Sequence, residues 1–505
     1  MRVRREQYVA IAVLAAVAAQ VALADEVGDD RKVERFGYEQ VVAKAERLAA
    51  TSHQPPKRVG DEFASLTYDR YRLIAPRFEK ALWRDTDNPF WIEPHHGGFL
   101  FPFRKTISIV DSSGNAEQWQ FDPSLFQYRG RASDLAEAPG GAFAGFRLLT
   151  QFLERPNHQE VASFLGASYF RVLGAYDWYG TSARGLAVDV GLGSPEEFPR
   201  FTKFWIKKPT DNKQLTVWAL MDSPAVAGAY EFVLRPGKTT NVDVRSAVWL
   251  RHGVQKLAFA PLTSMWMWEG WSKPSDESRM EVHDADGLLI RSGDRWVWRP
   301  LRRPKQTILS EFATDDLRGF GLMQRDREYE NYADNEARYH LRPHAWVEPT
   351  RNWGRGHVEL LELTATHEGV DNIGAYWVPE QPTYAGARYD FEYCLSFGQD
   401  EPESHRLAKF AHTIPRSTLR GTNYFLVVES NDSMRSADSA DLRASVDAAG
   451  GTLNDQRFEL QPDGNWVLSF DLLHEPAAVV DVTAAIYQAN ELVSEQWSYR
   501  WTPQP

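Results

Sequence analysis

The sequence predicts an all-β protein with a large N-terminal domain and a small C-terminal β-sandwich. Three observations support this class: apolar and polar residues alternate along most of the chain, helical periodicity is rare, and 18 of the 505 residues are tryptophan. Alternation with a period of two is typical of half-buried strands, and tryptophan suits the partly buried face of a sheet. A chain of this length exceeds one ordinary core, so at least two domains, or one very large β-domain and a small one, are expected.

The N-terminus has the organisation of a secretory signal peptide over residues 1–24. Three arginines among the first five residues precede an apolar run at 9–19, and Ala22-Leu23-Ala24 supplies a small-x-small cleavage motif. The run is short for a membrane span. Cleavage after Ala24 predicts a periplasmic protein without a stable membrane anchor, and leaves open the general secretory and twin-arginine routes.

Composition limits the partners and the means of stabilisation. Lys and Arg number 57 against 69 Asp and Glu, a formal net charge of -12, so a nucleic-acid partner is not expected. Cys394 is the single cysteine. An exported chain with one cysteine has no internal disulfide, so we expect core size to hold it together.

The elements of the N-terminal part are mostly strands. Apolar residues at helical spacing predict a helix over 36–50 that packs by one face, and a second short helix over 158–166. Alternation predicts a hairpin over 229–250, turning at Pro236-Gly237. Further strands are predicted within 104–111, 114–122, 213–223 and 294–301.

The C-terminal part is separated by a charged, proline-containing segment. Residues 398–417 break the alternating pattern, and the predicted linker lies within them at 401–412. Five short strands follow in about ninety residues, a spacing typical of a small β-sandwich. They are predicted within 423–430, 456–461, 465–473, 477–488 and 495–501.

Several familiar chemistries do not fit the motifs. Ser182 stands in G-x-S-x-x-G, one residue longer than a nucleophile elbow. His95 and His96 are adjacent, and neighbouring residues of a strand point to opposite faces, so they do not chelate one metal together. The glycine-rich stretch 191–197 has no β-α-β context, and DADG at 284–287 lacks the glutamate of a calcium loop. No metal or cofactor is predicted, and carboxylate chemistry remains.

The stretch HEGVDNIGAYW at 367–377 places two acids before a strand. Glu368 and Asp371 lie on a short polar turn, and the residues after them predict a buried aromatic strand. The turn is either a loop with two solvated acids or half of an acid/base pair in a sugar cleft. Spacing alone cannot select two catalytic acids from 69.

Long ordered motifs resemble a known family. GASYFRVLGAYDWYGTSARGLAVDVG, EEFPRFTKFW, LRPHAWVEPTRNWGRGHVELLE and DNIGAYWVP resemble the OpgG/OpgD (MdoG/MdoD) family of osmoregulated periplasmic glucan biosynthesis. The resemblance covers nearly the whole mature chain. It implies a mutarotase-like N-terminal β-sandwich over 25–400, a linker at 401–412 and an immunoglobulin-like domain over 413–505.

The resemblance also implies an activity on linear β-1,2-glucan. Some members resemble inverting endo-β-1,2-glucanases, and others resemble transglycosylases that form a cyclic glucan. The family's general acid corresponds to Asp371, and its opposing carboxylate, acting through waters or sugar hydroxyls, to Asp284. Asp286, two residues further, is a rival of Asp284. A third reading is a non-catalytic glucan-binding or assembly protein.

The same motifs supply the candidate substrate-binding residues. Tyr339 and Arg342 are expected in the cleft. A purely structural ion pair is an equally good interpretation of Arg342. Glu368 is a candidate like-charge neighbour that raises the pKa of Asp371. The other cleft candidates, for contact or for scaffolding, are His283, Arg184 and Tyr179. The glucan-synthesising membrane machinery is a candidate partner.

Overall fold

The computed structural model describes residues 35–502, except for 153–156, 212, 419–420 and 476–477. The predicted signal peptide, residues 1–24, lies outside the described residues. Strands make up most of the regular structure, which confirms the predicted predominance of β structure. Within the described part of the chain, no helix combines the length and the apolar character needed to cross a membrane.

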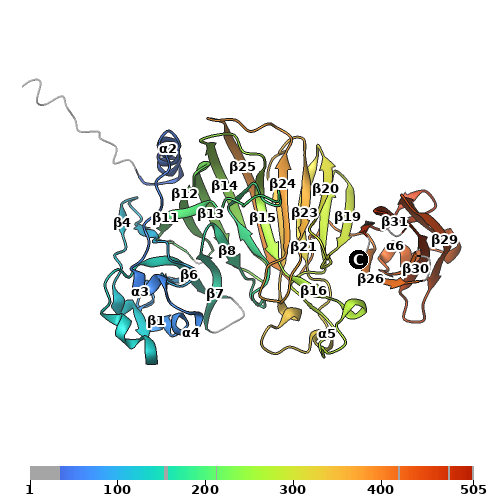
Figure 1. Cartoon of the computed structure of the whole chain (residues 1–505), viewed down its shortest axis with the longest axis horizontal. Helices are drawn as coiled ribbons and strands as arrows, with labels where there is room; N and C mark the ends of the chain where they lie inside the picture. Colours follow the sequence, from blue (N-terminus) through green and yellow to red (C-terminus); the bar gives the residue numbers. More distant parts are fainter. Residues whose placement is uncertain (1–34, 153–156, 212, 419–420, 476–477, 503–505) are drawn as a thin grey trace, which may run out of the picture.

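A ten-stranded sheet forms one layer of the N-terminal part (Figure 1). Its strand order is β2-β6-β7-β8-β9-β15-β24-β23-β20, and β10 pairs with β15. The strands are β2 (Phe90–His96), β6 (Phe143–Gln151), β7 (His158–Leu165), β8 (Tyr169–Val172), β9 (Ser182–Arg184), β10 (Leu186–Val188), β15 (Leu257–Ser264), β20 (Ile308–Thr314), β23 (Gly356–Glu362) and β24 (Ile373–Pro379).

A sheet of 15 strands forms the other layer and continues into the C-terminal part. Its order is β28-β31-β33-β19-β18-β21-β22-β25-β14-β13-β12-β11-β3-β4, and β32 pairs with β31. Strands β13 and β14 confirm the predicted hairpin. The N-terminal strands are β3 (Thr106–Val110), β4 (Ala116–Gln118), β11 (Arg200–Lys207), β12 (Leu215–Asp222), β13 (Val226–Arg235), β14 (Thr240–Leu250), β18 (Gly287–Ser292), β19 (Arg295–Pro300), β21 (Leu317–Met323), β22 (His344–Pro349) and β25 (Arg388–Gly398).

Aromatic side chains from both layers fill one apolar core. Phe164 of β7 lies edge-on to Phe232 of β13, with ring centroids 5.3 Å apart. Phe259 of β15 stacks on Phe391 of β25 at 4.2 Å. Alternate residues of each strand point into this core, so the aromatic content noted in the sequence serves sheet packing first.

The C-terminal strands form a four-stranded sheet and an extension of the large sheet. The four-stranded order is β26-β27-β30-β29. Strand β33 pairs in parallel with β19, so that Trp298 lies opposite Trp497. The strands are β26 (Lys409–Ser417), β27 (Gly421–Glu429), β28 (Leu442–Ala449), β29 (Thr452–Leu460), β30 (Trp466–Leu473), β31 (Val480–Gln488), β32 (Glu491–Leu492) and β33 (Gln496–Trp501).

A second apolar core joins the C-terminal strands to the N-terminal part. It includes Trp298 and Trp346 from the large sheet together with Phe410 and Tyr424 from the C-terminal strands. The buried Arg325 crosses the same boundary and pairs with Glu495 at 2.7 Å. Strand β26 begins at Lys409, inside the range 401–412. The domain boundaries and the two sandwich types remain predictions.

Helices are few and short, and the longest described helix is the one predicted over 36–50. This helix, α2, packs through Tyr38, Val41 and Ala45 on a tryptophan-rich patch that includes Trp205 and Trp218. The other helical elements are α3 (Asp61–Ala64), α4 (Tyr68–Tyr71), α5 (Tyr329–Tyr332), α6 (Asp432–Ser436), η1 (Phe78–Lys80), η2 (Pro123–Leu125), η3 (Gly130–Ala136), η4 (Gly270–Ser272), η5 (Tyr339–Leu341) and η6 (Ser439–Asp441), with α2 at Tyr38–Ala49.

The predicted helix over 158–166 is wrong, because this segment is strand β7. Its backbone pairs with β6 on one edge and with β8 on the other. Val161 and Phe164 enter the core from this strand. A short apolar run satisfies helical and strand spacing equally well, and here pairing on both edges decides the outcome.

Four short elements frame the candidate site. Strands β16 and β17 pair so that Trp266 lies opposite His283. A small apolar cluster that includes Met267, Val282, Tyr332 and Tyr339 packs them against α5 and η5. Strand β16 and helix α5 lie near one edge of the two layers (Figure 1). The remaining strands are β1 (Ile74–Pro76), β5 (Phe126–Tyr128), β16 (Trp266–Trp268) and β17 (Val282–His283).

Candidate active site

The turn before β24 places Asp371 next to β16. Asn372 is fully buried, and its amide forms two hydrogen bonds with Trp266. Its Nδ2 donates to the Trp266 carbonyl and its Oδ1 accepts from the Trp266 backbone N–H, both at 2.9 Å. These bonds fix the residue after Asp371 to β16, which pairs with the strand that leads to Asp284.

Asp371 is exposed. No described residue donates a hydrogen bond to its carboxyl group or forms an ion pair with it. Desolvation by the surrounding chain raises its pKa, and the negative charge of Asp284 raises it further. Arg171 and Arg342 oppose this shift. An accessible carboxyl with a raised pKa is suited to hold a proton and to donate it.

Asp284 has the opposite surroundings. It follows β17, is 5% exposed, and its backbone N–H donates to the Met265 carbonyl at 2.8 Å. Its carboxylate accepts a hydrogen bond from Nη1 of Arg342. Burial raises the pKa of Asp284 above its ordinary value, and the positive charges of Arg342 and Arg171 offset only part of this shift. The ion pair with Arg342 thus favours the ionised form of this carboxyl against the effect of burial.

Arg342 and Tyr339 connect Asp284 to Glu368. The Arg342 guanidinium lies over the Tyr339 ring, 4.1 Å from its centroid. The Tyr339 hydroxyl donates to Oε2 of Glu368 at 2.9 Å. Glu368 also pairs with Arg279 at 2.8 Å. The like charge that raises the pKa of Asp371 thus comes from Asp284, and Glu368 instead anchors Tyr339.

His283 lies beneath this group and is fully buried. Its Nδ1 lies 3.0 Å from Oε1 of Gln324, whose Nε2 donates to the Tyr339 carbonyl at 3.2 Å. Its Nε2 lies 3.1 Å from Oε2 of Glu281 and 3.7 Å from Oδ1 of Asp286. Burial lowers the pKa of His283, but Asp286 and Glu281 outweigh burial and raise it to about 9.

Asp286, the rival of Asp284, has a structural role in this arrangement. Its Oδ2 accepts hydrogen bonds from the backbone N–H groups of Arg325 and Asp326. The ligand atoms of Glu281, His283 and Asp286 lie within 4.8 Å of one another, a group that could also hold a metal ion and that sequence spacing did not indicate. When His283 is protonated, the same atoms of Glu281, His283 and Asp286 instead contact one another directly.

The stability of the protein should decrease between about pH 6.5 and pH 9 because His283 loses its proton. Its pKa is about 9 in the folded state against an ordinary value of 6.5, so its contribution is complete below pH 6.5 and fades as the pH rises through 9. Melting temperatures of the parent and of His283→Gln should differ more at pH 6 than at pH 9.5. A difference that does not change with pH would contradict a charged His283.

Tyr179 and Arg184 lie further from the two carboxyls. Tyr179 forms a side-chain hydrogen bond with Glu160. Its neighbour Gly180 approaches Arg342 so closely that an added Cβ would lie 2.9 Å from the Arg342 Cβ. Arg184 is buried and ion-paired with Glu196. Among the described residues, neither of them forms a hydrogen bond or an ion pair with Asp371 or Asp284.

Sequence reasoning missed Arg171 and Tyr169 on β8. The charge of Arg171 acts on both carboxyls. Burial raises the pKa of Tyr169, and the charge of Asp371 adds a smaller shift in the same direction. Both residues line a cavity of about 330 Å³, together with Phe198. The signal was available, because Tyr169 and Arg171 stand inside the quoted motif GASYFRV.

The structure thus joins five of the predicted residues in one polar network beside Asp371, namely Asp284, Arg342, Tyr339, Glu368 and His283. One carboxyl is exposed and unpaired among the described residues, and the other is buried and paired with an arginine. The fold and the site define a strand-rich protein with a carboxylate-centred polar site.

This chain belongs to the family described as "Periplasmic glucan biosynthesis protein, MdoG", which matches residues 36–501. A relative from Rhodopseudomonas palustris, named "Glucans biosynthesis protein G", is 39% identical over 91% of this chain and 92% of its own. Relatives with the same name from Ralstonia nicotianae and Sodalis glossinidius are 44% and 37% identical, over 76% and 92% of this chain and 75% and 92% of their own. The resemblance, the role in glucan biosynthesis and the periplasmic location are confirmed.

Proposed function

We propose that this protein is an inverting endo-β-1,2-glucanase that cleaves linear β-1,2-glucan during periplasmic glucan biosynthesis. The family supports a glucan substrate. The observation that carries the proposal is the unequal surroundings of the two carboxyls, because Asp371 is exposed and Asp284 is buried and paired with Arg342. Glycoside hydrolysis with two carboxyl groups requires one that donates a proton and one that accepts a proton.

In the proposed reaction Asp371 donates its proton to the glycosidic oxygen as the bond from this oxygen to the anomeric carbon breaks. A water molecule attacks the anomeric carbon from the opposite face of the ring. Asp284 accepts the proton that this water loses, through an intervening water or sugar hydroxyl. The products are an alcohol at the leaving sugar and a new reducing end with inverted configuration.

The remaining residues hold the sugar and the carboxyls in place. Arg342 favours the ionised form of Asp284, as supported by their ion pair, and the buried Tyr339 ring beneath Arg342 holds its guanidinium in place. Glu368 and His283 fix Tyr339 through its hydroxyl and, by way of Gln324, its carbonyl. Both are positioning residues in this account.

Incubation of the purified mature chain with linear β-1,2-glucan tests the proposal. We expect shorter linear chains, resolved by size-exclusion chromatography and mass spectrometry. Cyclic products would identify a transglycosylase, in which a sugar hydroxyl replaces water. Binding without any new product would identify the non-catalytic glucan-binding protein instead.

A further inference from the structure

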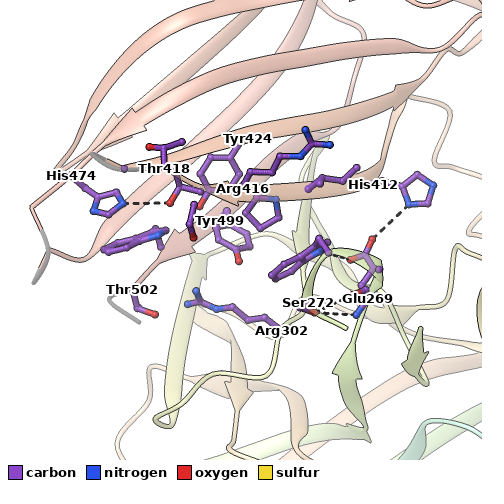
Figure 2. Close-up of a pocket in the computed structure, with 18 of the residues that line it drawn as sticks. Glu269, Ser272, Arg302, His412, Arg416, Thr418, Tyr424, His474, Tyr499 and Thr502 are labelled. Carbon is purple, nitrogen blue, oxygen red and sulfur yellow. Dashed lines mark hydrogen bonds and ion pairs between the residues drawn. The ribbon is translucent and has the colours of Figure 1, made fainter. Parts of the chain in front are cut away.

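A second cavity, of about 1230 Å³, lies between the C-terminal strands and the loops of the N-terminal part. Figure 2 shows His474, Tyr424 and Tyr499 on the C-terminal side and Arg302, Ser272 and Glu269 on the N-terminal side of a shared space. Neither Asp371 nor Asp284 lines it. Its lining includes Trp271, Arg302, Tyr424, His474, Tyr499 and Trp501.

This cavity continues toward the candidate active site. A neighbouring cavity of about 480 Å³ shares Trp271, Arg302 and Tyr499 with it and extends to Thr364 and Ala365. Those two residues lead into the turn that carries Glu368 and Asp371. The two cavities together form one elongated path, the interdomain groove, that runs from the C-terminal strands to Thr364 and Ala365, the residues that precede this turn in the sequence.

Aromatic rings form much of the wall of the interdomain groove. Trp501 and His474 lie against each other with ring centroids 3.5 Å apart and planes tilted by 32°, and both side chains are partly exposed. Trp271 is also partly exposed, and its indole N–H donates to Oε2 of Glu269 at 3.2 Å. Rings with one open face and a polar edge offer both apolar contact and hydrogen bonds to a ligand.

Buried polar groups in the groove lack partners. The Tyr424 hydroxyl and Nη2 of Arg302 have no hydrogen-bond partner in the part of the chain that the structure describes. Tyr424 is fully buried and Arg302 is 8% exposed. Such groups are costly unless a ligand or water satisfies them. The charges in the groove are mixed, because Arg302, Arg416, Glu269 and Glu281 all line it.

We propose that the interdomain groove is a second binding site for linear β-1,2-glucan, which holds the part of the chain remote from the reactive bond. This inference rests on the proposed function for the identity of the sugar. A pyranose ring lays its apolar face on an aromatic ring, and its hydroxyls match arginine and carboxylate side chains together. The mixed charge suits a neutral ligand, and the elongated path exceeds the volume of a typical small-molecule site.

Binding of glucans of two lengths to the full mature chain tests the proposal. Trp501→Ala removes one wall of the groove, and we expect it to weaken binding of long linear β-1,2-glucan by about threefold to tenfold. Binding of short linear β-1,2-gluco-oligosaccharides, which the catalytic turn can hold alone, should not change. Isothermal titration calorimetry in an Asp371→Asn background measures both without turnover.

Trp91→Ala is the matched control, because Trp91 also lies against a histidine, His158, with ring centroids 3.5 Å apart. Equal long-chain affinity in Trp501→Ala and Trp91→Ala would overturn the proposal, as would no binding of long glucan by the parent. If Trp501→Ala does not fold, His474→Ala must show the same loss. Trp501→Ala could lose affinity for long glucan while Asp371→Asn turns glucan over as fast as the parent. That combination would support the second binding site and reject only the assignment of Asp371 as the general acid.

Discussion

Asp371→Asn should bind linear β-1,2-glucan like the parent and turn it over about 10²–10⁴-fold more slowly, the usual worth of general acid/base assistance. Asparagine has nearly the shape of a protonated aspartic acid but cannot supply a proton to the glycosidic oxygen. The fold should be kept, because no described residue donates a hydrogen bond to this exposed carboxyl. Initial rates of reducing-end release, a melting curve and a binding isotherm measure the three properties.

Asp294→Asn provides a control for the same change in charge. Asp294 lies exposed in the turn between β18 and β19, outside the polar network of the site. Its turnover and melting temperature should equal those of the parent. If Asp371→Asn turned glucan over as fast as Asp294→Asn, Asp371 could not be the general acid.

Arg325→Met should lower the free energy of unfolding by roughly 3–5 kcal/mol, the cost of leaving buried charges without their partner. Arg325 is 8% exposed and pairs with Glu401 at 2.8 Å and with the fully buried Glu495 at 2.7 Å. It also lies over the Trp298 ring at 3.6 Å. His405 stays between the two glutamates and offsets part of the loss, so the lower half of this range is expected.

Chemical denaturation of Arg325→Met and Arg355→Met measures this contribution. Arg355 pairs with Glu380 at 3.0 Å, but both side chains are mostly exposed, so its loss should cost less than about 1 kcal/mol. Similar losses in the two variants would mean that Arg325 does not hold the C-terminal strands to the N-terminal part.

Sequence patterns correctly predicted the elements whose structure depends on residues close in the sequence. The helix over 36–50 and the hairpin over 229–250 follow from spacing along one segment. The helix predicted over 158–166 was wrong, because pairing with the strands before and after this segment makes it a strand. The parallel pairing of β19 with β33 joins residues about 200 positions apart, and no pattern within either segment indicates it.

The candidate site shows the same division. Asp371 and Asp284 were predicted only through the family resemblance, since their residue types alone are common. The role of Asn372 depends on its two hydrogen bonds to Trp266, and that of Arg171 on its charge beside both carboxyls. Such contacts link segments that are distant in the sequence. The sequence therefore shows that these residues are present but not that they come into contact.

The configuration of the first product tests the central claim, that Asp371 and Asp284 act on opposite faces of the sugar. Proton NMR during the earliest turnovers of linear β-1,2-glucan resolves the anomers before they interconvert. The new reducing end should appear first as the α-anomer, because water attacks opposite the leaving group. A first product in the β-configuration would contradict it and would require a covalent intermediate instead.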